Sequence, residues 1–222
     1  MGDVALVCGA SGALGQALVD AFLERGDRVV AVERRTAEDL PPGVIAESVD
    51  LTVPDEVEAL WERLAARGDR PRWVVNAVGG FRPGTVAATE PDQFQFLVDL
   101  NLATTLWSCR AAARRLDAGS AIVNVASRSA LEGGAGAALY SVTKAAVVRL
   151  TEVLAAELAE QRVRVNAILP SLIDTPANRA SMSVEALANA VPPAQIADVA
   201  SFLTSDAAAA VTGAVLPVYG WA

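Results

Sequence analysis

Residues 4–15 read VALVCGASGALG, and this stretch decides the fold. The first five residues form an uninterrupted apolar run of the kind that a buried parallel strand shows. A turn with Gly9, Gly12 and Gly15 follows, and the chain then enters a helical pattern. Glycines at this place let the backbone approach a pyrophosphate closely, and the helix N-terminus faces the anion with free N–H groups. The stretch therefore predicts a phosphate-binding turn at the start of an α/β fold.

The same alternation of strand and helix continues along the chain. We expect strands at 4–8, 29–32, 44–49, 73–77, 122–126, 163–168 and 215–218, and helices at 14–25, 55–66, 92–115, 141–159 and 196–204. Strands that alternate with helices of this length indicate βαβ units and a parallel sheet. The 222 residues, 53% of them hydrophobic, suffice for one large core. We therefore predict a three-layer Rossmann fold with a doubly wound parallel sheet of about seven strands, as a single domain over residues 1–222.

Composition narrows the classes of function. The chain has no histidine, which removes Ser-His-Asp and Cys-His nucleophile systems and histidine metal sites, so we expect no metal. A net charge of −8 disfavours nucleic acid as a partner. We see no apolar run of membrane-spanning length and no secretory signal, so we expect no membrane span. Cys8 and Cys109 lie in apolar segments and do not suggest a disulfide framework, which favours a cytoplasmic protein.

Acidic residues after the second and third strands bear on the choice of cofactor. Glu33 follows the second strand, where a carboxylate accepts hydrogen bonds from ribose hydroxyls and repels a 2′-phosphate. Arg34 comes next, and an arginine at this place can hold a 2′-phosphate. We therefore favour NAD(H) and keep NADP(H) as the alternative. Asp50, which precedes Leu51 after the third strand, either binds the adenine amino group or caps the next helix.

Tyr140 and Lys144 predict acid–base chemistry. They lie four residues apart at the start of a helix, so both side chains share one face. A tyrosine titrates near 10 in water, and a fixed ammonium close by stabilises the phenolate and lowers that pKa. Lys144 is the one lysine among 18 basic residues, so a chance surface pair is a weak explanation.

Two further polar residues could complete this site. Ser127 follows the fifth strand, thirteen residues before Tyr140, and its hydroxyl could hold a substrate oxygen; otherwise it is a turn residue. Asn101 lies in the predicted helix 92–115, where asparagine has poor propensity. A polar side chain between Leu100 and Leu102 needs a partner, so we expect a structural or catalytic hydrogen bond.

Together these residues resemble the short-chain dehydrogenase/reductase family over essentially the whole chain. The resemblance implies a catalytic tetrad of Asn101, Ser127, Tyr140 and Lys144. In it Lys144 also binds the nicotinamide ribose, and Asn101 holds a water that links Lys144 to solvent. With the acids above, the cofactor-binding positions that we expect are Gly9, Ser11, Gly12, Leu14, Gly15, Glu33, Arg34, Asp50, Leu51, Asn76, Ala77, Gly79, Tyr140, Lys144, Pro170, Ile173 and Thr175.

The chain also departs from the family pattern. Cys8 stands at the usual first threonine, Ala13 at the middle glycine, and Ala77 and Ser171 replace an asparagine and a glycine. Residues 12–15, 78–81 and 169–182 resemble dihydropteridine reductases in particular. As the resemblance has it, those enzymes lack the serine found here as Ser127, which fits ketone or alcohol chemistry better.

We therefore expect a ketoreductase-like oxidoreductase that moves a hydride between a nicotinamide cofactor and a carbonyl or alcohol carbon, with Tyr140 as general acid and base. Pterin reduction with NADH and a non-catalytic dinucleotide sensor are the alternatives. The irregular segment 170–193 is the candidate substrate loop.

The two long predicted helices, 92–115 and 141–159, are apolar around much of their circumference, so we expect each to be covered on more than one side. On the second helix, Val153 and Leu154 can face the sheet, while Ala145 and Val148 remain to be covered. This pattern predicts a homodimer or homotetramer that packs through the two helices.

Overall fold

The computed structural model describes residues 2–35 and 40–221, and the sheet confirms the predicted fold class. Seven parallel strands lie in the order β3-β2-β1-β4-β5-β6-β7. Their bounds are β1 Val4–Cys8, β2 Arg28–Glu33, β3 Ile45–Ser48, β4 Trp73–Asn76, β5 Ala121–Val125, β6 Arg164–Pro170 and β7 Val215–Val218. The strand order reverses between β1 and β4, and in such sheets ligands bind beyond the carboxyl ends of the strands at this point.

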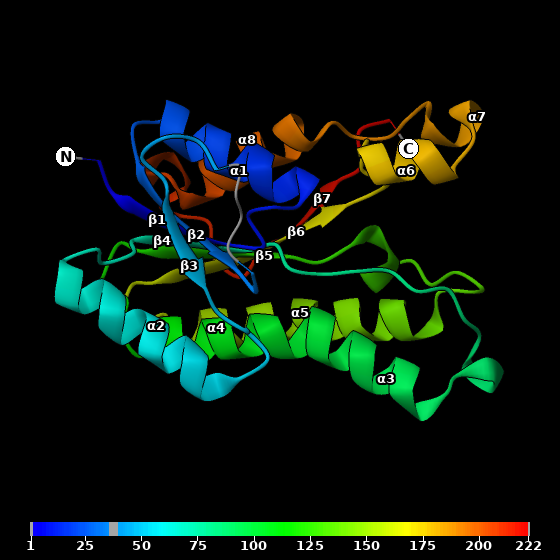
Figure 1. The fold of residues 1–222 in the computed structure, drawn as a ribbon, viewed down its shortest axis with the longest axis horizontal. Coiled ribbons are helices and arrows are strands. Elements are labelled where there is room, and N and C mark those ends of the chain that lie inside the picture. The colour runs from blue at the N-terminus through cyan, green and yellow to red at the C-terminus, as the bar shows by residue number, and fades with distance from the viewer. Residues whose placement is uncertain (1, 36–39, 222) are drawn as a thin grey trace.

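Helices cover both faces of the sheet (Figure 1). One layer holds α1 (Ala13–Glu24) and α8 (Pro193–Thr204), and the other holds α2 (Pro54–Arg67), α4 (Thr104–Ala113) and α5 (Ala138–Glu157). Fully buried side chains such as Phe22 of α1 and Leu64 of α2 fill the space against the strands. Because the strands are covered on both faces, β1, β4, β5 and β6 are buried along their whole length.

The predicted helix 92–115 is present as one continuous helical path over residues 91–113, but the change of winding within it was not predicted. The structure has α3 (Pro91–Leu97), then a π-helical turn (Val98–Ala103), and then α4. Asn101 lies within this wide turn, with its side chain hydrogen-bonded to residues outside the helix. A wide turn of this kind re-aims a side chain without ending the helical path, and such turns are frequent at functional sites.

Other elements differ from the prediction at their ends. α5 begins at Ala138, three residues earlier than expected, and β6 runs on to Pro170. The segment 170–193 is less irregular than predicted, because it contains α6 (Pro176–Ser181) and α7 (Val184–Leu187). The assignment of faces on α5 was wrong at two positions: Val148 is buried within this chain, whereas Val153 is 47% exposed.

Within the described ranges, we find no helix that combines the length and the apolar character needed to span a membrane.

Candidate active site

The glycine turn after β1 holds its backbone in a conformation that side chains would disturb. Gly9 has a φ of +85°, which favours glycine. A Cβ at Gly15 would lie 2.0 Å from the Gly9 carbonyl oxygen, so this position admits no side chain. Gly12 is the N-cap of α1, and the first N–H groups of a helix have no partner within it. Gly9, Gly12 and Gly15 therefore form a cradle that fits a pyrophosphate at a helix N-terminus.

Glu33, the last residue of β2, contacts the glycine turn. Its carboxylate accepts a hydrogen bond from the Ser11 backbone N–H. Arg34 is exposed beside it. Glu33 thus lies against the glycine turn, where a ribose would be recognised, and Arg34 follows it in the chain.

Asp50 is engaged locally. Its Oδ1 accepts hydrogen bonds from the Thr52 hydroxyl at 2.6 Å and from the Thr52 N–H at 2.9 Å. These bonds hold the pKa of Asp50 below its usual value. Asp50 thus forms a local turn with Thr52 but does not cap α2, whose N-cap is Val53 without a side-chain cap bond. The neighbouring Leu51 is buried.

Asn76 and Gly79 have different surroundings although both follow the predicted pattern after β4. The Asn76 side chain is buried and donates to Asn124 Oδ1 at 2.8 Å and to Cys109 Sγ at 3.5 Å. The Asn76 amide group and the Ala77 N–H, which bonds to the Cys8 carbonyl, are thus already engaged. Any contact of these two residues with a cofactor would therefore use other backbone atoms. A Cβ at Gly79 would lie 2.8 Å from Lys144 Nζ, so its backbone lies directly against the lysine.

The predicted tetrad comes together at this loop. Asn101 is fully buried, and its Oδ1 accepts from the Gly80 N–H at 2.9 Å. The Nδ2 of Asn101 donates to the Gly80 carbonyl at 3.1 Å and to the Thr143 hydroxyl at 3.2 Å. The backbone of Gly79, which precedes Gly80, lies close to the side chains of both Asn101 and Lys144. The loop after β4, the wide turn and α5 thus converge on one place.

Tyr140 and Ser127 form the second half of the tetrad. Burial raises the pKa of Tyr140, and a hydrogen bond with the Ser127 side chain lowers it by less, so the net pKa is above its usual value. The Ser127 hydroxyl also accepts from the Ser129 hydroxyl at 3.0 Å, and it begins a short 3₁₀ turn (Arg128–Ala130) after β5. Ser127 is therefore both a turn residue, as one interpretation held, and a partner of the phenol.

Lys144 is almost completely buried. Its Nζ donates to the Val125 carbonyl at 3.0 Å, and burial lowers its pKa to about 8. The prediction that Lys144 lowers the pKa of Tyr140 does not describe this structure, because burial outweighs the other influences and raises the pKa of the phenol. The same burial keeps Tyr140 protonated at neutral pH.

The segment after β6 borders the same edge of the sheet. Pro170 is the last residue of β6 and is buried. The Ile173 carbonyl accepts from Asn178 Nδ2 at 2.8 Å, and the Thr175 hydroxyl caps α6 by accepting from the Asn178 N–H at 3.1 Å. Asn178 therefore fixes both predicted cofactor contacts in place.

Sequence reasoning missed the residues that support the tetrad. Thr143 bonds to Asn101 and donates to the Tyr140 carbonyl at 2.9 Å, and Phe81 packs edge-on to Tyr140 with ring centroids 5.1 Å apart. The position of Thr143 beside Lys144 on α5 was a signal for the first contact. For Phe81 the sequence offered only its place two residues after Gly79.

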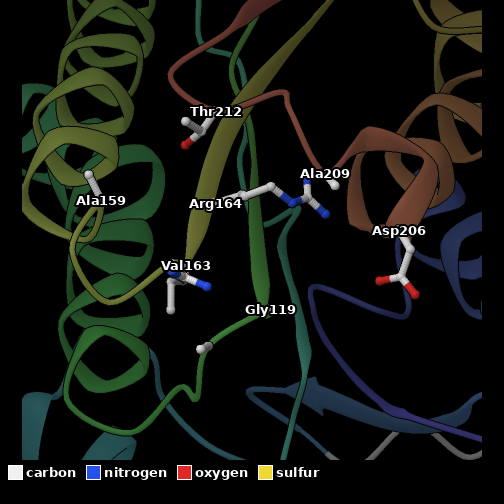
Figure 2. A pocket seen from close by; sticks show the side chains of 9 residues that line it. Gly119, Ala159, Val163, Arg164, Asp206, Ala209 and Thr212 are labelled. Atoms are coloured by element: carbon white, nitrogen blue, oxygen red, sulfur yellow. The ribbon is translucent and has the colours of Figure 1, made fainter.

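A large hollow lies at the opposite edge of the sheet (Figure 2). It measures about 530 Å³ and is lined by residues that include Gly119, Arg164, Asp206 and Thr212. Arg164 begins β6, and its guanidinium donates to the carbonyls of Leu203 at 2.5 Å and Ser205 at 3.0 Å. None of the predicted site residues lines this hollow.

Comparison with known proteins identifies the family of this chain. The family model described as Enoyl-(Acyl carrier protein) reductase matches residues 9–220. An uncharacterized short-chain type dehydrogenase/reductase, y4vI, from Sinorhizobium fredii is 33% identical over 99% of this chain, which spans 43% of that protein's length. L-xylulose reductase from Bos taurus is 33% identical, with 99% of this chain and 96% of that protein covered. The chain belongs to the short-chain dehydrogenase/reductase family.

A solved structure agrees with this assignment. The 3-ketoacyl-(acyl-carrier-protein) reductase from Brucella melitensis complexed with NADH has a TM-score of 0.89 and 28% identity, with 99% of this chain and 98% of that chain covered. The family predicted from the sequence is therefore confirmed. These relatives favour neither pterin reduction nor a non-catalytic sensor.

Proposed function

We propose that this protein transfers a hydride reversibly between a nicotinamide cofactor and a carbonyl or alcohol substrate, with Tyr140 as general acid and base. The observation that supports the proposal is the convergence of Asn101, Lys144 and Tyr140 around the loop after β4, with Ser127 beside the phenol. When bound, the nicotinamide ring supplies or accepts the hydride at its C4 atom. The substrate that we propose is a small-molecule carbonyl compound or alcohol.

Tyr140 transfers the proton to and from the substrate oxygen. Because burial raises its pKa, the phenol is protonated at neutral pH and can donate to the substrate oxygen during reduction. The Ser127 hydroxyl, which bonds to the phenol, orients the same oxygen. Lys144 is charged below its pKa of about 8 and stabilises the negative charge that develops on Tyr140 as the proton leaves. In the oxidative direction the same proton returns to Tyr140.

The other buried polar groups hold this arrangement. Asn101 fixes Gly80, and the Val125 carbonyl fixes the ammonium of Lys144. Lys144 has donors free for ribose hydroxyls, since an ammonium has three and the Val125 carbonyl takes one. We propose that Gly9, Gly12 and Gly15 hold the pyrophosphate and that Glu33 makes NAD(H) the preferred cofactor. Arg34 supports NADP(H) as the alternative.

Binding of NADH and NADPH, followed by a panel of carbonyl compounds with the preferred cofactor, tests the proposal. We expect binding of NADH in preference to NADPH and oxidation of the cofactor by at least one carbonyl compound. Tight binding without turnover across the panel would leave a sensor as the better explanation. Failure to bind either cofactor would contradict the proposal at its first step.

We also propose that the protein is a homodimer or homotetramer that packs through α4 and α5. A hollow of about 380 Å³ lies between these helices, with Leu106, Leu150 and Leu154 among its lining residues. Val153 on α5 is 47% exposed. Light scattering at micromolar concentration should report a dimer or tetramer, and a stable monomer would refute this assembly.

A further inference from the structure

Phe81 lies beside the proposed acid but has no part in the chemistry described above. Its ring centroid is 5.1 Å from that of Tyr140, and the two ring planes meet at 84°. Although it contacts a largely buried tyrosine, Phe81 is 57% exposed. Its ring therefore keeps much of its surface available next to the phenol that meets the substrate.

The backbone on both sides of Phe81 is restrained. Gly80 is hydrogen-bonded through both its N–H and its carbonyl to the Asn101 side chain. Arg82 follows, and its guanidinium lies over the Phe96 ring, 3.8 Å from the centroid. An exposed aromatic ring held on a restrained backbone loses little conformational entropy when a ligand packs on it. Such a ring is suited to recognition.

The charges near this ring are already engaged. Arg82 is stacked on Phe96, and Arg128, which follows Ser127, donates to Glu132 at 2.7 Å and lies over the Tyr219 ring. The exposed surface that the structure places against the phenol ring is thus the aromatic ring of Phe81, which suits an uncharged group on the substrate.

We propose that Phe81 is a specificity-determining residue that selects carbonyl substrates with an aromatic ring bonded to the carbonyl carbon. The inference rests on the proposed function, since it places the substrate oxygen at Tyr140 and Ser127. A flat ring on the carbonyl carbon can pack on the exposed surface of Phe81 while the oxygen meets the phenol. A saturated ring of equal carbon number offers the same oxygen but lacks the aromatic contact.

A matched pair of ketones tests the inference: acetophenone and cyclohexyl methyl ketone, assayed by cofactor oxidation for kcat/KM. The aryl ring also changes the intrinsic reactivity of the carbonyl, so the readout is the ratio of the two kcat/KM values in each variant relative to the wild-type ratio. Phe81→Leu should lower the ratio in favour of acetophenone by about 2- to 10-fold, the range that aromatic pairing supports, and Phe81→Tyr should retain it. Phe202→Ala is the control, because Phe202 is 47% exposed on α8 and adjoins Leu203, which lies at the opposite edge of the sheet.

The outcomes separate this inference from the function on which it rests. A ratio that is unchanged in Phe81→Leu would overturn the role of Phe81. So would turnover of other carbonyl compounds with none of acetophenone, and the proposed function would then stand. Absence of turnover with every carbonyl compound would overturn both.

Discussion

The two edges of the sheet differ in how their buried cations are used. At the amino-end edge, Arg164 borders the hollow of about 530 Å³, and its guanidinium is bonded to the carbonyls of Leu203 and Ser205. At the carboxyl-end edge, Lys144 bonds to one carbonyl and lies against a glycine backbone. The cation at the hollow therefore serves the fold, whereas the cation at the carboxyl-end edge has donors to spare. The partners of a buried polar group are thus a better guide to its role than the presence of a hollow beside it.

The sharpest test of this comparison is Tyr140→Phe at the carboxyl-end edge. We expect turnover to fall by about 10²- to 10⁴-fold, because the general acid is removed while the ring and its contact with Phe81 remain. Steady-state kinetics with the best carbonyl substrate measures the effect. The chain's other tyrosine provides the control: Tyr219→Phe should leave kcat within about twofold. Retention of most turnover in Tyr140→Phe would remove Tyr140 from the mechanism.

At the amino-end edge, Arg164→Leu should act on stability and not on chemistry. The change leaves buried carbonyls without their donor, which we expect to cost about 3 kcal/mol in the free energy of unfolding. Urea denaturation measures this loss, and kcat of the folded variant should be unchanged. Arg162→Leu is the matched control, since Arg162 lines the same hollow but is exposed, and its cost should stay within about 0.5 kcal/mol. A loss of kcat in Arg164→Leu would show that the two edges are not independent.

Lys144→Met should stabilise the protein while it abolishes turnover. The depression of the Lys144 pKa from 10.5 to about 8 means that burial of the charge costs roughly 3 kcal/mol at neutral pH. The lost hydrogen bond to the Val125 carbonyl offsets about 1 kcal/mol of the gain. We therefore expect a net stabilisation of about 2 kcal/mol at pH 7 by urea denaturation. A destabilised variant would mean that the buried ammonium serves the fold, as Arg164 does.

The pH dependence of the difference in stability between Lys144→Met and the wild-type protein shows whether the buried ammonium causes it. Below pH 8 Lys144 is protonated in both the folded and the unfolded chain, so the stabilisation in Lys144→Met is present in full. Between pH 8 and about 10.5 the folded wild-type protein has lost this proton while the unfolded chain still binds it, so the wild-type protein gains stability and the difference fades. Arg149→Met, an exposed cation on the same helix, should show no such trend.

The sequence predicted the fold for physical reasons, and the tetrad stays a prediction whose four side chains the structure brings to one edge of the sheet. Buried parallel strands are apolar throughout, and the glycine turn has one stereochemical purpose, so residues 4–15 were sufficient for the class of fold. Tyr140 and Lys144 are linked by helical spacing, which a sequence displays directly. The positions of Ser127 and Asn101 came from the family resemblance and from the poor fit of asparagine to a helix interior.

The features that we did not predict from the sequence depend on contacts between distant segments. The wide turn at Asn101 and the contact between Phe81 and Tyr140 join different elements, and no periodicity encodes them. The direction of the Tyr140 pKa shift also needed the structure, because burial raises this pKa while a hydrogen bond with Ser127 lowers it by less, and the extent of burial depends on packing. The exposure of Val153 was mispredicted because it, too, depends on how α5 packs.

The π-helical turn over residues 98–103 is equivalent to one extra residue inserted into a continuous helix from α3 to α4. Each residue of a regular helix advances the side-chain direction by about 100°. Rewinding this turn as regular α-helix without removing a residue would therefore rotate Cys109 and Ala112, both buried against the sheet layer, towards a different side of α4. The packing of α4 consequently holds the wide turn at Asn101 in place.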